Sequence, residues 1–175
     1  METYNLRQVK KEIRVLGTAV KPAGVGRGYH VVGAVFRGRL CLDGIMRTRA
    51  EGPDVTREAV EMIVGSPHHP QIRVVMLQGD LIGCGAKIDP YALSSGTSRP
   101  VIALNFDDAP LRFEEGPFHR FSLKRGETPV SVISIGLRSR VALRVLEKAA
   151  YGSSTPEALR VAGLVVSALS EDFPT

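Results

Sequence analysis

Runs of apolar and β-branched residues dominate the first quarter of the chain and indicate strands. Residues 13–20 and 29–36 form two such runs, joined by the glycine-rich connection KPAGVGRG, which is too short for a helix. A tight turn at Arg37, Gly38 and Arg39 leads into a third run, residues 40–47. Because short connections join antiparallel neighbours, this part of the sequence predicts a three-strand meander.

After the meander, helical and strand-like patterns alternate. Asp54 is expected to cap a helix in which Val55, Ala59 and Ile63 recur at helical spacing, before Gly65 ends it. The continuous apolar runs that follow are typical of strands covered on both faces. These two runs span residues 72–77 and 101–105, with a short helix expected over 88–95.

The last third of the chain predicts a return to helices. Residues 107–125 are polar and are expected to be irregular, and residues 130–135 suit a last strand or an extended segment. One helix is expected over 139–150. Thr155 and Pro156, a capping residue followed by proline, mark the start of another helix that runs to about residue 169. The pattern as a whole predicts an α/β fold.

Length and composition are typical of one globular domain. The chain has 175 residues, 43% of them apolar and 23% charged, so we expect a single domain over 1–175 with a core from about 13 to 169. No apolar run approaches the roughly 20 residues of a membrane helix, and the first residues lack a signal-peptide core. Only Cys41 and Cys84 are present, too few for a disulfide framework. We therefore expect a cytoplasmic protein without a membrane partner; the oligomeric state stays open.

The positive charge of the chain is concentrated near its start. Residues 1–42 carry eight lysines and arginines against Glu2 and Glu12, whereas the rest of the chain has 15 basic and 16 acidic residues. Such asymmetry favours a polyanionic partner, because neutralising phosphates releases their counterions. Nucleic acid is therefore a plausible partner, and ordinary solvated arginines are the alternative. The candidate nucleic-acid-binding residues are Lys21, Arg27, Arg37, Arg39, Arg140, Arg144 and Lys148.

Two groups of these cations have a local pattern. The loop from Gly24 to Gly28 looks like a phosphate cradle, but strand-forming residues follow it, so a hairpin loop is the better interpretation. Arg140, Arg144 and Lys148 recur every four residues and would share one helix face. That face could contact phosphates, or it could be ordinary solvated surface.

Carboxylates are the other candidate class. Asp43, Asp80, Asp107 and Asp108 lie near expected strand ends or in loops and are the candidate catalytic residues. Aspartate is also favoured in turns, so each is weak evidence alone. The adjacent His68 and His69 have no third ligand nearby in the sequence, and we assign no metal ligands from the residues themselves.

Several segments, in order, carry a family resemblance. They are VVGAVFRGRLCLDGIM (31–46), GPDVTREAV (52–60), QIRVVMLQG (71–79), RPVIAL (99–104) and TPEALRVAGLVVSAL (155–169). Together they resemble a mostly archaeal family, the domain of unknown function ninety-nine, which is similar to endonuclease V. The resemblance implies a ribonuclease-H-like mixed sheet, an antiparallel three-strand meander plus parallel strands, flanked by helices. It also implies that the fourth and fifth strands lie beside the first.

The resemblance implies a metal-dependent nuclease site from which this chain departs. Nucleases of this superfold hold Mg²⁺ or Mn²⁺ with aspartates at the ends of strands one and four, because such cations prefer oxygen ligands. The resemblance implies an acidic pair late in strand one, where this chain reads Gly17, Thr18, Ala19 and Val20. It also implies Asp before Gly at the end of strand four, where this chain has Gln78. A family histidine in the last helix is replaced by Gly163, whereas Asp43, Asp54 and Arg160 match.

Three functions follow as hypotheses. The first is an endonuclease-V-like protein with an eroded metal site that still binds nucleic acid and needs no cofactor. The second is an active endonuclease that uses Mg²⁺ or Mn²⁺ through Asp80 with Asp107 or Asp108. The third is a non-enzymatic domain for protein interaction or small-ligand binding, with the old site packed. An open basic cleft around Ala19 and Gln78 would favour the first, and a closed apolar surface there the third.

Overall fold

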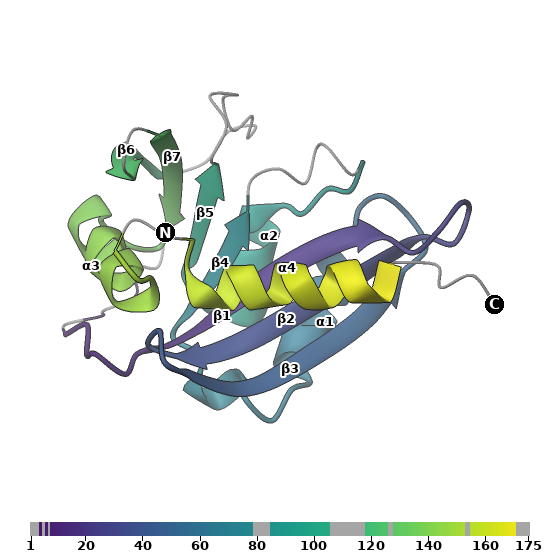
Figure 1. The fold of residues 1–175 in the computed structure, drawn as a ribbon, viewed down its shortest axis with the longest axis horizontal. Helices are drawn as coiled ribbons and strands as arrows, with labels where there is room; N and C mark the ends of the chain where they lie inside the picture. The colour runs from purple at the N-terminus through teal and green to yellow at the C-terminus, as the bar shows by residue number, and fades with distance from the viewer. Residues whose placement is uncertain are drawn as a thin grey trace.

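A computed structural model describes residues 4, 6, 8–78, 85–105, 118–125, 128–152 and 155–170. Seven strands and four α-helices are present in these residues (Figure 1). The strands are β1 (Arg14–Pro22), β2 (Tyr29–Arg37), β3 (Cys41–Ala50), β4 (Val74–Gln78), β5 (Val101–Asn105), β6 (His119–Arg125) and β7 (Thr128–Ile135). The helices are α1 (Thr56–Val64), α2 (Pro90–Thr97), α3 (Ser139–Ala149) and α4 (Glu157–Ser170), with a 3₁₀ turn at His69–Gln71.

All seven strands form one mixed sheet in the order β3-β2-β1-β4-β5-β7-β6. The meander β1–β2–β3 is antiparallel, β4 and β5 run parallel to β1, and β7 is antiparallel to β5 and β6. The expected meander and the expected place of β4 and β5 beside β1 are therefore confirmed. In this order β3 lies three places from β4.

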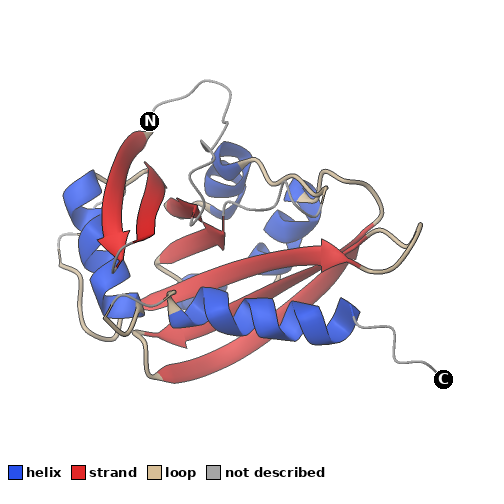
Figure 2. Ribbon diagram, turned by 45° about the horizontal axis from the view of Figure 1, so that its top comes forward, coloured by secondary structure: helices blue, strands red, loops and turns tan. Residues whose placement is uncertain are grey.

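Helices cover both faces of the sheet, so the central strands are buried on two sides (Figure 2). On one face, Val55, Ala59 and Ile63 of the α1 region and Leu93 of α2 share a core with Leu16 and Leu77. On the other face, α3 and α4 pack against residues that include Val15 and Met76. This two-sided burial explains why β4 and β5 have continuous apolar sequences.

Three expectations from the sequence need correction. Residues 118–125 belonged to a segment expected to be irregular, yet β6 occupies nearly all of them, because Phe121 and Leu123 alternate with exposed polar residues. Asp54 is not the cap of α1; Val55 stands at that position, although Asp54 Oδ1 accepts a hydrogen bond of 3.1 Å from the Thr56 amide. The helix expected over 88–95 begins only at Pro90, since Asp89 caps it and accepts from the Tyr91 and Ala92 amides.

The contact between α4 and β1 is a backbone contact. A Cβ atom at Gly17 would lie 2.2 Å from the carbonyl carbon of Ala158 and 2.4 Å from the Leu159 nitrogen. Further along, Lys21 Nζ donates to Ser167 Oγ at 2.8 Å. The two contacts are four residues apart along β1 and nine residues apart along α4, and each of these spans is about 13 Å long. Helix α4 therefore runs alongside β1 in the same direction (Figure 1).

Gly17→Ala should destabilise the protein, because its methyl group would overlap the α4 backbone. We expect a loss of about 2–3 kcal/mol in the free energy of unfolding, measured by urea denaturation. The matched control is Gly163→Ala, in the same helix–strand pair, where an added Cβ meets nothing within 4 Å. This control should stabilise the protein by about 0.5–1 kcal/mol, since glycine is a poor helix former. Equal stability of the Gly17 variant and the parent would contradict the close packing.

Candidate functional site

The carboxyl ends of β1 and β4 lie side by side beneath α4. Thr18 is paired with Leu77, so Ala19 and Gln78 are the next residues on strands about 4.8 Å apart. Leu16 and Leu77 belong to the core under α1 and α2. Because side chains alternate along a strand, Ala19 and Gln78 both project toward α4.

Helix α4 places its own residues over this point. Ala19 packs with Ala162, and Gly163 follows in the helix. Ser167, one turn further on, donates to the Gly163 carbonyl at 2.7 Å and accepts from Lys21. Ala19 and Gln78, two positions at which the resemblance implied a departure, are thus neighbours, and Gly163, the third, follows Ala162 in the helix above Ala19.

These residues do not fit a divalent metal ion. Ala19 and Gly163 supply no ligand atom, Gln78 supplies only a neutral amide, and Lys21 adds a positive charge nearby. Mg²⁺ and Mn²⁺ need several oxygen ligands, carboxylates above all. Within the part of the chain that the structure describes, no three His, Cys, Asp or Glu side chains are grouped so that they could hold a metal.

Three of the four candidate carboxylates are not among the described residues. Asp80, Asp107 and Asp108 lie outside the described residues, as does Cys84. In the sequence, Asp80 follows the end of β4 by two residues, and the other two follow the end of β5. Their role in metal binding stays a prediction.

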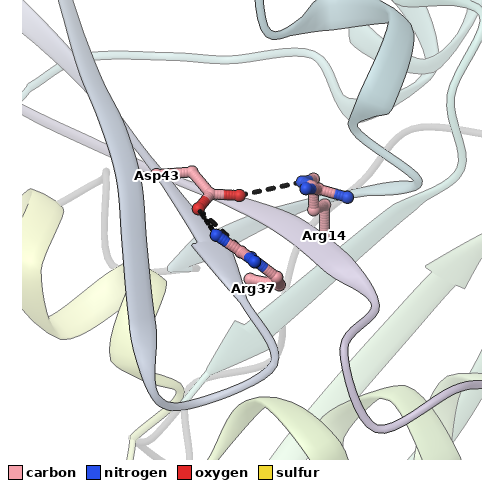
Figure 3. Close-up of polar contacts among 3 residues, drawn as sticks. All are labelled: Arg14, Arg37 and Asp43. Carbon is pink, nitrogen blue, oxygen red and sulfur yellow. Dashed lines mark hydrogen bonds and ion pairs between the residues drawn. The ribbon is translucent and has the colours of Figure 1, made fainter.

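Asp43 lies at the opposite end of the sheet, between two arginines (Figure 3). Its carboxylate accepts from Arg14 Nε at 2.8 Å and from Arg37 Nη2 at 2.8 Å, and its side chain is only 13% exposed. Arg14 is five residues before Ala19 on β1, a distance of about 16 Å along the strand. The fourth candidate carboxylate therefore neutralises two cations far from the Ala19 position.

The two guanidinium groups need this partner. Arg14 and Arg37 are directly paired across β1 and β2, and like charges in that position repel each other. Asp43 offsets the repulsion, and in return the Arg37 hydrogen bond, followed by that of Arg14, holds the pKa of Asp43 below its ordinary value although burial opposes this shift.

The candidate nucleic-acid-binding residues divide between the two ends of the sheet. Lys21 and Arg27 lie at the carboxyl end of β1 and in the following hairpin loop. Arg37, Arg39 and Lys148 line one pocket near the start of β1. Arg140 and Arg144 are exposed on α3, as is Lys148, in agreement with the expected common helix face.

Sequence reasoning did not single out several cations that join this second group. Lys11 lines the same pocket, and a neighbouring pocket adds Lys10, Arg14 and Arg73. The excess of positive charge in residues 1–42 indicated most of them, but Arg73 comes from the start of β4 and only the fold brings it near.

The histidine pair is structural in the described residues. His69 Nε2 lies 2.8 Å from the carbonyl oxygen of Thr97, and the ring of His68 packs closely against Gly44. The ring of His69 thus contacts a helix and that of His68 a strand, as expected for adjacent residues.

None of the described helices has the length and hydrophobicity that a membrane span requires.

Asp43→Asn should lower stability at neutral pH by about 1 kcal/mol, because it leaves the two arginines without a counter-charge. The native pKa of Asp43 is depressed, so its contribution is present above its unfolded-state pKa and disappears as pH falls through the native pKa. Urea denaturation over a pH series should therefore show the full difference between variant and parent at pH 7 and a progressively smaller one as the pH falls below the ordinary pKa of an aspartate. A difference that does not shrink as the pH falls would contradict this account.

Comparison with known proteins agrees with the family resemblance of the sequence. The endonuclease dU family matches residues 11–170. A UPF0215 protein from Methanothermobacter thermautotrophicus is 34% identical, with 97% of this chain and 94% of that protein covered. A UPF0215 protein from Methanopyrus kandleri is 32% identical, with 95% of each chain covered.

Solved structures confirm the ribonuclease-H-like fold. Endonuclease V from Ciona intestinalis, in complex with DNA containing an inosine, has a TM-score of 0.68 at 11% identity, over 95% of this chain and 89% of that one. A protein of unknown function from Archaeoglobus fulgidus has a TM-score of 0.69 at 22% identity, over 89% and 97%. With a family match that spans nearly its whole length, this chain belongs to the endonuclease dU family.

Proposed function

We propose that this protein binds nucleic acid and has lost metal-dependent cleavage at the position where its superfold holds the metal. The observation that carries the proposal is the group formed by Ala19, Gln78 and Gly163 at the carboxyl ends of β1 and β4. The fold supports a nucleic-acid-related function, since one similar structure is an endonuclease V complexed with DNA. The residues at this position support binding without hydrolysis.

A protein cation lies near the position at which the family resemblance implies metal cations. Lys21 is two residues beyond Ala19 on the same side of β1, and Ser167 holds its ammonium group against α4. An ammonium group attracts a phosphate, but it does not activate water as a metal ion does. Lys21 therefore supports retention of a phosphate at this site in the absence of cleavage.

The second cationic surface strengthens the case for a polyanion. The arginines and lysines near the start of β1 come from the segment before β1, from β1 and β2 themselves, from the turn after β2, from the residue before β4 and from α3. These charges come from separate parts of the chain, and the fold brings them onto one surface. Ordinary solvated side chains have no need to gather in this way. Each phosphate contact made there would release counterions and make binding dependent on salt.

Nucleic-acid binding is tested by fluorescence anisotropy with DNA and RNA oligonucleotides over a salt series. We expect binding at low salt whose affinity falls steeply, with a logarithmic slope of about −3 if four phosphates of a single strand are neutralised. Incubation of the same complexes with Mg²⁺ or Mn²⁺ should leave deaminated and branched substrates intact. Undetectable binding at low salt would favour a non-enzymatic interaction or small-ligand domain instead. Cleavage that Asp80→Ala abolishes would establish the active-nuclease alternative.

Returning the carboxylates should create a metal site. Ala19→Asp combined with Gln78→Asp places two carboxylates on adjacent strands, both toward α4, so they can share one ion. We expect Mn²⁺ binding by calorimetry with a dissociation constant of about 1 mM or tighter. The isosteric control, Ala19→Asn with Gln78→Asn, should bind no Mn²⁺, and neither should the parent. Equal Mn²⁺ binding by parent and double variant would show that the existing carboxylates already suffice.

A further inference from the structure

A small cationic pocket lies at the end of the sheet opposite Ala19 and Gln78. Its volume is about 190 Å³, and three separate parts of the chain line it. The segment before β1 contributes Lys11 and Glu12, and the end of α3 contributes Lys148. The end of β2, the turn after it and the first residue of β3 contribute Arg37, Arg39, Leu40 and Cys41.

Backbone contacts fix these segments against one another. The Gly38 amide donates to the Ile13 carbonyl at 2.8 Å, which joins the β2–β3 turn to the start of β1. Gly38 has a φ of +61°, and a Cβ there would lie 2.4 Å from the Lys11 carbonyl oxygen and 3.8 Å from that of Lys148. Only glycine satisfies both the dihedral angle and the close approach. The backbone segments that carry the pocket's side chains are therefore held in place against one another.

The two arginines of the pocket are oriented by their neighbours. Arg37 uses Nε and Nη2 to donate to Asp43, which fixes one edge of its guanidinium group. Arg39 donates from Nη1 to the Ala150 carbonyl at 3.4 Å and stacks over the Tyr151 ring at 5.1 Å. A guanidinium group has five donors, so each arginine keeps further N–H groups for a ligand. Oriented donors lose less entropy when they bind an anion.

The charge of the pocket is unbalanced. Four cationic side chains, those of Lys11, Arg37, Arg39 and Lys148, face a single carboxylate, that of Glu12. Asp43 does not change this balance, because it is shared by Arg37 and Arg14. The adjoining pocket shares Lys11 and Glu12 and adds three more cations. An anion placed in the small pocket would therefore meet positive charge on several sides.

Size and charge together select the ligand. A volume of about 190 Å³ is below the usual range of roughly 300–1,000 Å³ for pockets that enclose a whole small molecule, so the pocket suits a single compact group. A phosphate monoester carries about −1.5 to −2 charges at pH 7 and three acceptor oxygens, whereas a diester within a strand carries one charge. A convergent set of cations favours the monoester.

We propose that the pocket formed by Lys11, Arg37, Arg39 and Lys148 binds the terminal phosphate of a nucleic-acid strand. This inference rests on the proposed nucleic-acid binding and specifies the strand end that the protein recognises. On the exposed face of α3, Arg144 lies four residues before Lys148, and Arg140 lies four residues before Arg144. Each of these intervals is about 6 Å along the helix. The two arginines provide a path for the backbone phosphates that follow the terminal one.

The test compares one oligonucleotide sequence with a 5′-phosphate, a 3′-phosphate or hydroxyl groups at both ends, by fluorescence anisotropy. We expect one phosphorylated form to bind about fivefold or more tightly than the hydroxyl form, as strong charge-assisted hydrogen bonds to the terminal group require. Lys11→Gln with Lys148→Gln should abolish this preference. Arg57→Gln with Lys87→Gln is the matched control, since it removes two exposed cations near α1 and should keep the preference.

A second readout locates the terminal phosphate. Cys41 is exposed and lines the pocket, so in a Cys84→Ser background its alkylation by iodoacetamide reports occupancy. The preferred phosphorylated oligonucleotide should slow alkylation at a concentration at which the hydroxyl form does not. Inorganic phosphate and pyrophosphate, each tested alone, show whether the pocket is instead a site for free anions. If either protects Cys41 from alkylation at a lower concentration than the oligonucleotide does, recognition of a strand end is overturned.

The outcomes separate the two proposals. Equal affinity for all three ends, or a preference that survives in the Lys11 and Lys148 variant, overturns the terminal-phosphate site while nucleic-acid binding stands. Failure of every oligonucleotide to bind at low salt overturns the proposed function, and the strand-end inference with it.

Discussion

The contact between the backbones of α4 and β1 at Gly17 determines the arrangement of the candidate site. With no side chain between them, the helix lies directly on the strand and runs in its direction, so each turn of α4 is placed over a defined residue of β1. Gly163 is thereby brought over the Ala19 region, and Ser167 reaches Lys21. A larger residue at position 17 would separate the two elements and move α4 away from the Ala19 region.

The site and the positive charge are spatially separated in this protein. The end of the sheet at which the family resemblance places metal ligands has small or neutral residues and Lys21. The end at which β1 begins gathers seven lysines and arginines around two pockets, together with the carboxylates of Asp43 and Glu12. Among the described residues, those around Ala19 and Gln78 form neither an open basic cleft nor a closed apolar surface, since Gln78 is exposed and Lys21 lies nearby.

The sequence predicted the fold better than the surface. Apolar runs and glycine turns identify the meander and the buried strands, because a strand that is buried on both faces has a continuous apolar sequence. Strand β6 escaped prediction because only Phe121 and Leu123 carry its alternation, among polar neighbours. The family resemblance pointed to Ala19, Gln78 and Gly163 separately, and their role as an eroded metal site stays a prediction. The cationic pocket could not be predicted, since the separations of Lys11, Arg39 and Lys148 along the chain carry no periodicity and these residues are brought together by contacts made only in the fold.

The pairing of β2 with β3 has one irregularity, and it falls at Asp43. Phe36 is opposite Leu42 and Val35 is opposite Gly44, so Asp43 is an extra residue inserted between two regular pairs. Removal of that residue would leave an unbroken ladder in which every other partner is unchanged. The carboxylate is thus an addition that the hydrogen bonding of the sheet does not require. Whether Arg14 and Arg37 share an anion therefore depends on this one inserted residue, and not on the identity of the neighbouring side chains.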